Sequence, residues 1–183
     1  MALLGRRELL TALAELDEEL GNLNVRGEVF IVGGAAMAIA YDTRRATADV
    51  DAVFIPSSEV RTAASRVAER LNLESDWLND GAKAFMPGED ENQIGVYEGR
   101  NLSVAAASPQ YLLAMKLMAS RVERDQDDIR DLYRLCGLTT AEEGLDLLSS
   151  YYPEHLILPR VQYLLQEMFP EGCERSRDTD RSR

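Results

Sequence analysis

Two aspartates, Asp49 and Asp51, are separated by a single residue just before an apolar run. On an extended chain alternate side chains point to the same face, so both carboxylates can reach one ion. Proteins usually hold Mg²⁺ through one or two carboxylates together with the phosphates of a substrate. A pair of such ions, about 3.5–4 Å apart, can stabilise an in-line displacement at phosphorus. The spacing therefore predicts that Asp49 and Asp51 are metal ligands and catalytic residues.

A Gly33-Gly34 pair lies upstream, between an apolar run and an alanine-rich segment that we expect to be a helix. Glycines at such a junction allow a tight turn and let a ligand approach the backbone closely. The first N–H groups of the helix and its dipole then favour a phosphate group. Arg44 and Arg45 follow the helix and can donate charge-assisted hydrogen bonds to phosphate. These four residues predict a nucleotide-binding corner opposite the two carboxylates.

Other phosphate-binding motifs do not fit this chain. It contains neither the G-x-G-x-x-G of dinucleotide-binding folds nor the G-x-x-x-x-G-K-[ST] of P-loops. The observed order is strand, Gly-Gly, helix, Arg-Arg, Thr47-x-Asp49-x-Asp51 and strand. This order resembles the nucleotidyltransferase superfamily, and most closely its AbiEii/MenT-type toxins. The resemblance adds Thr47 to the nucleotide-binding residues.

A second part of the pattern lies further along the chain. Lys116 stands on a mainly apolar helix, and such a lysine either extends to solvent or reaches an anion in a cleft. Asp127 and Asp128 begin the next predicted helix, where the helix dipole favours acids whatever their function. The resemblance implies that Lys116 contacts the nucleotide phosphates and that Asp127 or Asp128 orients it or acts as a base. The sequence does not choose between these two aspartates. The resemblance covers about residues 28–132.

The resemblance implies Mg²⁺-dependent transfer of a nucleoside monophosphate from a nucleoside triphosphate to an acceptor, with release of pyrophosphate. For the toxin type the acceptor is the 3′ end of tRNA, within a toxin–antitoxin system that includes a cognate partner protein. A protein hydroxyl, as in antitoxins that modify a toxin, and a small hydroxylated compound stay open as acceptors. A non-catalytic relative that binds nucleotide or a partner also stays open. The superfamily commonly has a third carboxylate on a later strand, but the predicted strand 101–105 has none and Glu98 precedes it.

The chain is strongly acidic. Its 183 residues include 20 Lys and Arg against 32 Asp and Glu, which gives a formal net charge of −12. Broad electrostatic binding of nucleic acid depends on neutralising phosphates with basic side chains. A tRNA acceptor would therefore need a local basic patch, whereas a protein or small-molecule acceptor would not.

Other classes of site are excluded by composition. Cys136, Cys173 and His155 are too few for a zinc cluster or a disulfide framework. No apolar run is long enough to span a bilayer, and charges near the start do not suit a signal peptide. We expect a cytoplasmic protein with no membrane partner.

The pattern of elements predicts an α+β fold, in which a small mixed sheet is flanked by helices and followed by a helical C-terminal part. We expect a nucleotidyltransferase-like core at residues 1–135, a helical extension at 136–170 and a disordered tail at 171–183. The predicted strand 50–55 is nearly all apolar and is expected to be buried on both faces. The predicted helices are 3–20, 35–41, 59–71, 108–121, one from about 126, 139–151 and 157–169; the predicted strands are 29–32, 50–55, 93–97 and 101–105, with an edge strand at 83–86.

Overall fold

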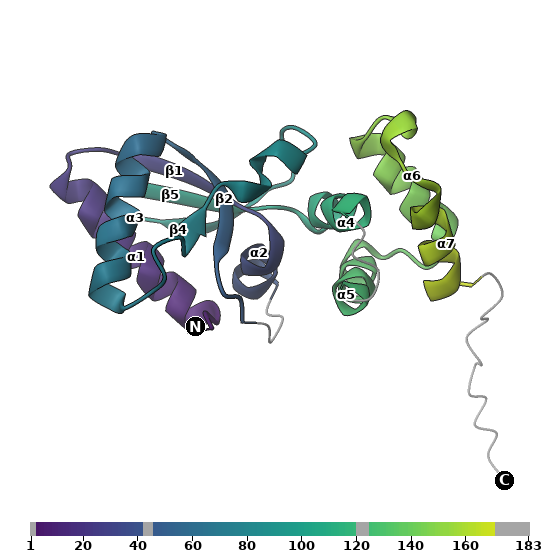
Figure 1. Ribbon diagram of the computed structural model, residues 1–183, viewed down its shortest axis with the longest axis horizontal. Helices are drawn as coiled ribbons and strands as arrows, with labels where there is room; N and C mark the ends of the chain where they lie inside the picture. The colour runs from purple at the N-terminus through teal and green to yellow at the C-terminus, as the bar shows by residue number, and fades with distance from the viewer. Residues whose placement is uncertain (1–2, 42–45, 120–124, 171–183) are drawn as a thin grey trace, which may run out of the picture. The chain divides into compact units, whose positions relative to one another are not determined.

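The computed structural model describes residues 3–41, 46–119 and 125–170. These residues form a five-stranded mixed sheet, helices and a helical C-terminal part, which confirms the predicted fold class (Figure 1). In chain order the helices and strands are α1 (Arg6–Asn22), β1 (Gly27–Ile31), α2 (Gly33–Ala40), β2 (Val50–Ile55), α3 (Ser57–Leu71), β3 (Leu78–Asn79), the 3-10 helix η1 (Gly81–Phe85), β4 (Ile94–Glu98), β5 (Leu102–Ala106), α4 (Pro109–Ala119), α5 (Gln126–Cys136), α6 (Ala141–Tyr151), the 3-10 helix η2 (Glu154–Leu156) and α7 (Pro159–Met168).

The chain divides into two compact units, Met1–Met115 and Lys116–Arg183, and the division falls within α4. The domain boundaries expected from the sequence stay a prediction, and residues 171–183 lie outside the described part of the chain. Within that described part, no helix is both long and apolar enough to cross a membrane.

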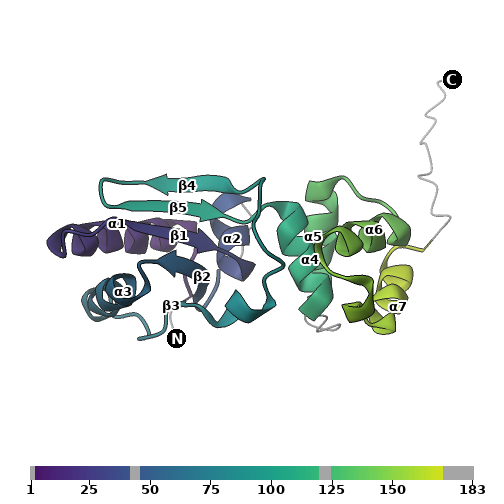
Figure 2. The same cartoon turned by 90° about the horizontal axis from the view of Figure 1, so that it is seen from above.

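The sheet of the first unit has the strand order β3-β2-β1-β5-β4. The β1–β2 and β4–β5 pairs are antiparallel, whereas β1–β5 and β2–β3 are parallel. Helices α1 and α3 run beside each other along the sheet, as Figures 1 and 2 show. Alternate residues of the three central strands are buried, and they form the core of this unit: Val29, Ile31, Val50, Ala52, Phe54, Leu102, Val104 and Ala106.

The opposite face of the central strands is only partly covered. Phe30 and Val53 are half-buried, and the Ile55 side chain at the end of β2 is 62% exposed. The prediction that β2 is buried on both faces was therefore wrong. A sheet that contains antiparallel pairs can leave one face towards solvent, so an apolar strand need not be covered twice.

Polar contacts hold α1 against the rest of the first unit. The buried Glu19 carboxylate pairs with Arg66, at 3.3 Å, and with Arg70 on α3. Asp17, two residues before Glu19, accepts a hydrogen bond from the backbone N–H of Asn101 at 2.6 Å, in the turn between β4 and β5. Helix α1 is thus bound to both α3 and the sheet by side chains that the sequence alone would place on a solvated face.

The segment after α3 differs from the prediction. An edge strand was expected at residues 83–86, but Gly81–Phe85 is the 3-10 helix η1 and the edge strand is the shorter β3. The backbone N–H of Gly81 donates to Asn79 Oδ1 at 2.9 Å, which turns the chain directly after β3. Trp77, just before β3, is 1% exposed and donates from Nε1 to the Ala64 carbonyl at 2.9 Å.

In the second unit, packing around Tyr133 joins three helical segments. The Tyr133 ring on α5 stacks on Phe169 with the ring centroids 3.8 Å apart. On α6, a Cβ added to Gly144 would lie 1.7 Å from the Tyr133 hydroxyl oxygen. The absence of a side chain at Gly144 therefore permits the close contact of α5 and α6.

We predict that Leu16→Ala lowers the free energy of unfolding of the first unit by about 2–5 kcal/mol, because it leaves a cavity where α1 packs on the sheet. Leu16 is fully buried on α1. Denaturant titration followed by the fluorescence of Trp77, the one tryptophan of the chain, measures the change. The control Ser65→Ala, at an exposed position of α3, should change stability by less than about 0.5 kcal/mol. Equal stability of the two variants would contradict this packing.

Candidate active site

Gly33 and Asp51 lie against each other where β1 ends and β2 begins. The backbone N–H of Val32 donates to the Asp51 carbonyl at 2.9 Å, which fixes the two chain segments. Gly33 has φ +65°, a left-handed conformation that favours glycine. A Cβ at Gly33 would lie 3.4 Å from Asp51 Oδ2. The predicted phosphate corner and one predicted metal ligand are therefore neighbours.

Gly34 lies against Thr47 in the same way as Gly33 lies against Asp51. A Cβ at Gly34 would lie 3.3 Å from Thr47 Oγ1, and this hydroxyl donates to the Asp49 carbonyl at 2.9 Å. Two backbone hydrogen bonds between Thr47 and Leu4, of 2.7 and 3.0 Å, hold the segment in place. The Thr-x-Asp-x-Asp segment thus packs directly on the Gly-Gly corner.

Asn79 lies beside both aspartates. It is the register partner of Asp51 on the adjacent strand β3, and its Nδ2 lies 3.4 Å from Asp49 Oδ2. The sequence analysis did not select Asn79. Its signal was the Asn79-Asp80-Gly81 triplet, which is typical of a turn, and only the pairing of β3 with β2 shows that this turn adjoins the aspartates.

The residues of this corner are suited to bind a hard divalent cation such as Mg²⁺. Asp49 is exposed and Asp51 is half-buried. Mg²⁺ takes oxygen ligands and is commonly bound by one or two carboxylates plus substrate phosphates and water. In the described part of the chain there is no group of three or more His, Cys, Asp or Glu side chains that could hold a metal. The donor set is therefore a pair of carboxylates that phosphate oxygens would complete.

Two other acids of the first unit, Glu98 and Asp80, have basic partners. Glu98, the nearest acid to the strand that commonly carries a third carboxylate in the superfamily, forms an ion pair with Arg26 at 2.6 Å. Asp80 is bound by Arg61 at 2.5 Å, and this hydrogen bond lowers the pKa of the Asp80 carboxyl. The Arg61–Asp80 pair connects α3 to the end of β3 and thereby supports the position of Asn79.

Helix α2 begins at the same corner. Its preceding residue, Val32, is extended and has no side chain that could cap the helix. The first N–H groups of a helix have no partner within the helix and, with the helix dipole, favour an anion. The corner therefore combines N–H donors with the carboxylate of Asp51. Arg44 and Arg45, also predicted to bind phosphate, lie outside the described residues.

In the second unit, Lys116 is held between two aspartates. Its Nζ lies 2.7 Å from Asp125 Oδ1 and 2.7 Å from Asp128 Oδ2. Asp127 is different, because its side chain is 83% exposed and pairs with Arg130 at 3.3 Å. Of the two aspartates left open by the sequence, Asp128 is the one that contacts Lys116. Adjacent helical positions point about 100° apart, which separates the two aspartates.

Asp125 is a second residue that the sequence analysis missed. It precedes α5, so helical periodicity gives no information on its direction. Lysine has three N–H donors, and the two carboxylates occupy two of them. The Lys116 side chain stays 21% exposed. The third N–H of the ammonium stays available to an oxygen acceptor, while the two carboxylates together outweigh its charge.

The thiol of Cys136 is poorly suited to nucleophilic or metal chemistry. Burial raises the pKa of the Cys136 thiol to about 11, so the thiol is almost entirely protonated near neutral pH. His155 lies in η2 of the second unit, and Cys173 is outside the described residues.

Comparison with known proteins agrees with the geometry. A family described as "Nucleotidyltransferase of unknown function (DUF6036)" matches residues 8–142, which include the Gly-Gly corner, both aspartates and Lys116. No curated protein and no solved structure matches the chain. The resemblance to the nucleotidyltransferase superfamily is thereby confirmed, whereas the narrower resemblance to AbiEii/MenT-type toxins stays a prediction. The chain belongs to the DUF6036 family of nucleotidyltransferases.

Proposed function

We propose that this protein transfers a nucleoside monophosphate from a nucleoside triphosphate to a hydroxyl group of an acceptor, with Mg²⁺ as cofactor. The observation that carries the proposal is the contact of Gly33 with Asp51 at the first turn of α2. This contact brings together a helix end suited to phosphate and a carboxylate suited to a metal ion. Nucleotidyltransferases generally use divalent metals, and the family of this chain supports that class of reaction.

The reaction exchanges one phosphorus–oxygen bond for another. The acceptor hydroxyl oxygen forms a bond to the α-phosphorus while the bond from that phosphorus to the oxygen bridging to the β-phosphorus breaks. Pyrophosphate leaves with the bridging oxygen and the electron pair, and the hydroxyl proton passes to water. Such a displacement needs positioned reactants and neutralised charge more than covalent help from the protein.

Each residue of the corner has a proposed role in that displacement. The backbone N–H groups at Gly33 and Gly34 bind the triphosphate. Asp49 and Asp51 hold Mg²⁺, which supplies charge neutralisation at the phosphates when bound. Asn79 positions Asp49 through the contact between its amide and the Asp49 carboxylate.

Lys116 is proposed to bind nucleotide phosphate, with Asp125 and Asp128 as its positioning residues. The two ion pairs hold the ammonium in one place. We assign no role to Asp127, because it is exposed and contacts Arg130 instead. Arg44 and Arg45 stay proposed phosphate ligands on the resemblance alone.

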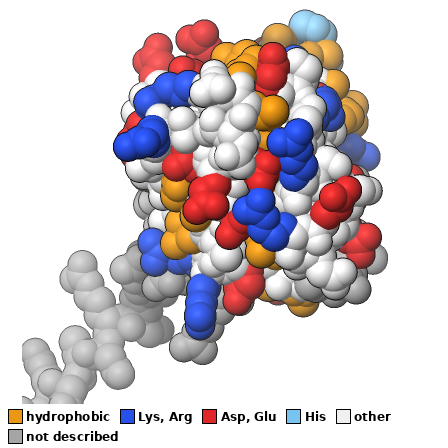
Figure 3. Space-filling model, turned by 90° about the vertical axis from the view of Figure 1, so that its left-hand side faces the viewer, with side chains coloured by type: hydrophobic (Ala, Val, Ile, Leu, Met, Phe, Trp, Pro, Cys, Tyr) orange, Lys and Arg blue, Asp and Glu red, His pale blue; other side chains and the backbone are white. Residues whose placement is uncertain are grey.

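The resemblance predicts tRNA as the acceptor and a toxin–antitoxin system as the setting. On the face of the molecule drawn in Figure 3, basic side chains are interspersed with acidic ones.

A second candidate function is nucleotide binding without catalysis, as in a regulatory relative. It is favoured by one observation, the presence of two rather than three carboxylates in the described site.

We predict that Asp49→Asn and Asp51→Asn each lower nucleotidyl transfer at least about 100-fold, because each removes a charge that holds the metal at the reacting phosphate. The measurement incubates the protein with α-labelled nucleoside triphosphates, Mg²⁺ and either total tRNA or cell lysate. Asp76→Asn, the same change at an exposed acid outside the site, serves as the control and should keep full activity.

The molecule that carries the label distinguishes the possible acceptors from one another. Label on RNA supports the toxin hypothesis, and label on a polypeptide supports modification of a partner protein. If the wild-type protein binds nucleotide but labels nothing, the binding-only function is correct and the transfer reaction is not.

We also predict that Asp128→Asn and Asp127→Asn behave differently. Loss of a charged partner costs about 1.5–3 kcal/mol, so Asp128→Asn should lower kcat/KM roughly 10- to 100-fold, by releasing Lys116. Asp127→Asn should leave kcat/KM within about twofold, because exposed ion pairs contribute little. Circular dichroism checks that both variants fold. Equal losses in the two variants would show that Lys116 is not positioned by Asp128.

A further inference from the structure

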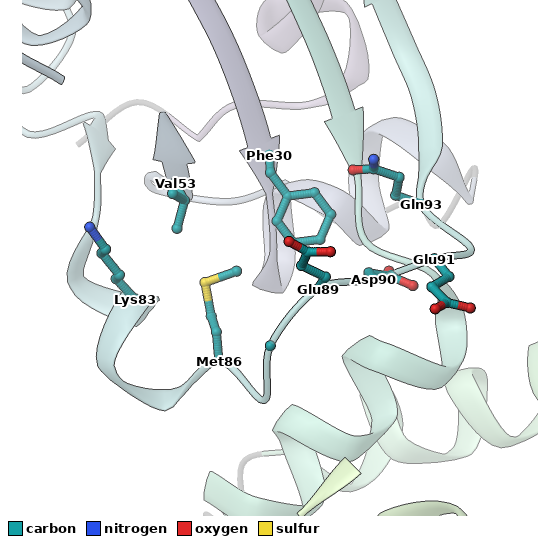
Figure 4. A pocket seen from close by; sticks show the side chains of 9 residues that line it. Phe30, Val53, Lys83, Met86, Glu89, Asp90, Glu91 and Gln93 are labelled. Atoms are coloured by element: carbon teal, nitrogen blue, oxygen red, sulfur yellow. The ribbon is translucent and has the colours of Figure 1, made fainter. Parts of the chain in front are cut away.

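The open face of the sheet in the first unit carries a pocket of about 630 Å³. Phe30 on β1, Val53 on β2 and Met86 after η1 form its apolar part. Glu89, Asp90 and Glu91 form an acidic side, as Figure 4 shows. A volume of this size is typical of sites for small molecules.

This pocket adjoins the proposed catalytic corner. Val53 is two residues from Asp51 on the same strand and the same face, a separation of roughly 7 Å. Met86 and Lys83 belong to the segment that begins at Gly81, where a Cβ would lie 3.9 Å from Asp51 Oδ1. A molecule in the pocket can therefore direct a group towards Asp51.

The apolar floor is held rigidly. The Phe30 ring meets the ring of Tyr111 edge to face, with centroids 5.6 Å apart and planes at 88°. The Tyr111 hydroxyl donates to the Gly88 carbonyl at 2.8 Å, which fixes the loop above the floor. The shape of the pocket is thus set by packing within the protein and is preformed for a ligand.

The acidic side is built on the same loop. Asp90 is buried and its carboxylate accepts hydrogen bonds from the Ser108 backbone N–H at 2.7 Å and the Ser108 hydroxyl at 3.0 Å. Glu89 and Glu91 flank this fixed residue and are exposed. Asp90 therefore acts as the anchor that presents the two glutamates, and its own charge adds to theirs.

The charge of the lining selects the ligand. Among the described residues that line the pocket, three are acidic and only Lys83 is basic, and Lys83 lies away from Glu91 in Figure 4. A surface of one sign attracts ligands of opposite charge and repels those of the same charge. The pocket therefore disfavours phosphates and favours protonated amines, and the net charge of −12 on the whole chain acts in the same direction.

We propose that this pocket binds the acceptor, and that the acceptor is a small hydroxylated compound carrying protonated amino groups. The inference rests on the proposed nucleotidyl transfer and names its substrate class. The glutamates bind the ammonium groups, the apolar floor contacts the carbon skeleton, and one hydroxyl is directed towards Asp51. That hydroxyl oxygen bonds to the α-phosphorus while the bond from this phosphorus to the bridging oxygen breaks. The products are the nucleoside monophosphate ester of that hydroxyl and pyrophosphate, with the hydroxyl proton released to water.

Binding without nucleotide tests the pocket by itself. The probe is kanamycin, and its fully N-acetylated derivative is the comparison, because it keeps the hydroxyls and loses the positive charges. Isothermal titration should show that kanamycin binds at least about tenfold more tightly than the acetylated form. Glu89→Gln combined with Glu91→Gln should weaken kanamycin binding about tenfold or more. Glu74→Gln with Asp76→Asn, the same charge change at exposed positions outside the pocket, should change it less than about twofold.

Transfer of label from α-labelled nucleoside triphosphates gives the second readout. Label on kanamycin, lost in the Glu89→Gln/Glu91→Gln variant, supports the proposal. Equal binding of both probes, or unchanged binding by that variant, overturns it. Label on tRNA or protein but not on kanamycin overturns the acceptor class while the transfer reaction stands. Label on no acceptor, with nucleotide bound, overturns the transfer reaction itself, and the titration then shows separately whether the pocket selects cations.

Discussion

The close approach of Asp51 to a glycine corner is the constraint on which the site depends. Antiparallel pairing of β1 with β2, completed by the Val32–Asp51 backbone hydrogen bond, fixes where Asp51 stands. The left-handed φ of Gly33 then turns the chain into α2 without a side chain in the way. The sheet register, the turn and the helix start thus determine one another. A residue other than glycine at position 33 would strain the turn.

The first unit has one region suited to anions and another suited to cations. The start of α2 offers N–H donors for an anion, whereas the loop around Asp90 offers carboxylates for a cation. Phe30 and Val53, which are register partners on β1 and β2, form the apolar part of the pocket. A reaction between a polyphosphate and a cationic acceptor would use both preferences, because each reactant is repelled from the region of the other.

Local patterns predicted much of the fold and the corner. The Gly-Gly junction and the Asp-x-Asp spacing were readable because each arises within one short segment, and the order of helices and strands followed from periodicity. What the sequence could not give was long-range pairing. The contact of Asn79 with Asp49 depends on the pairing of β3 with β2, and the contact of Asp125 with Lys116 depends on how two helices are joined. The half-exposed face of β2 likewise depends on which layers cover the sheet.

The central claim is that Asp49 and Asp51 share a divalent ion beside the Gly33 corner. Electron paramagnetic resonance of Mn²⁺, titrated in the presence of a non-hydrolysable nucleoside triphosphate, measures that ion directly. We expect the wild-type protein to bind Mn²⁺ together with the nucleotide, and Asp49→Asn/Asp51→Asn to lose this binding while its circular dichroism is unchanged. Equal Mn²⁺ binding by the wild-type protein and this variant would contradict the assignment of the metal site.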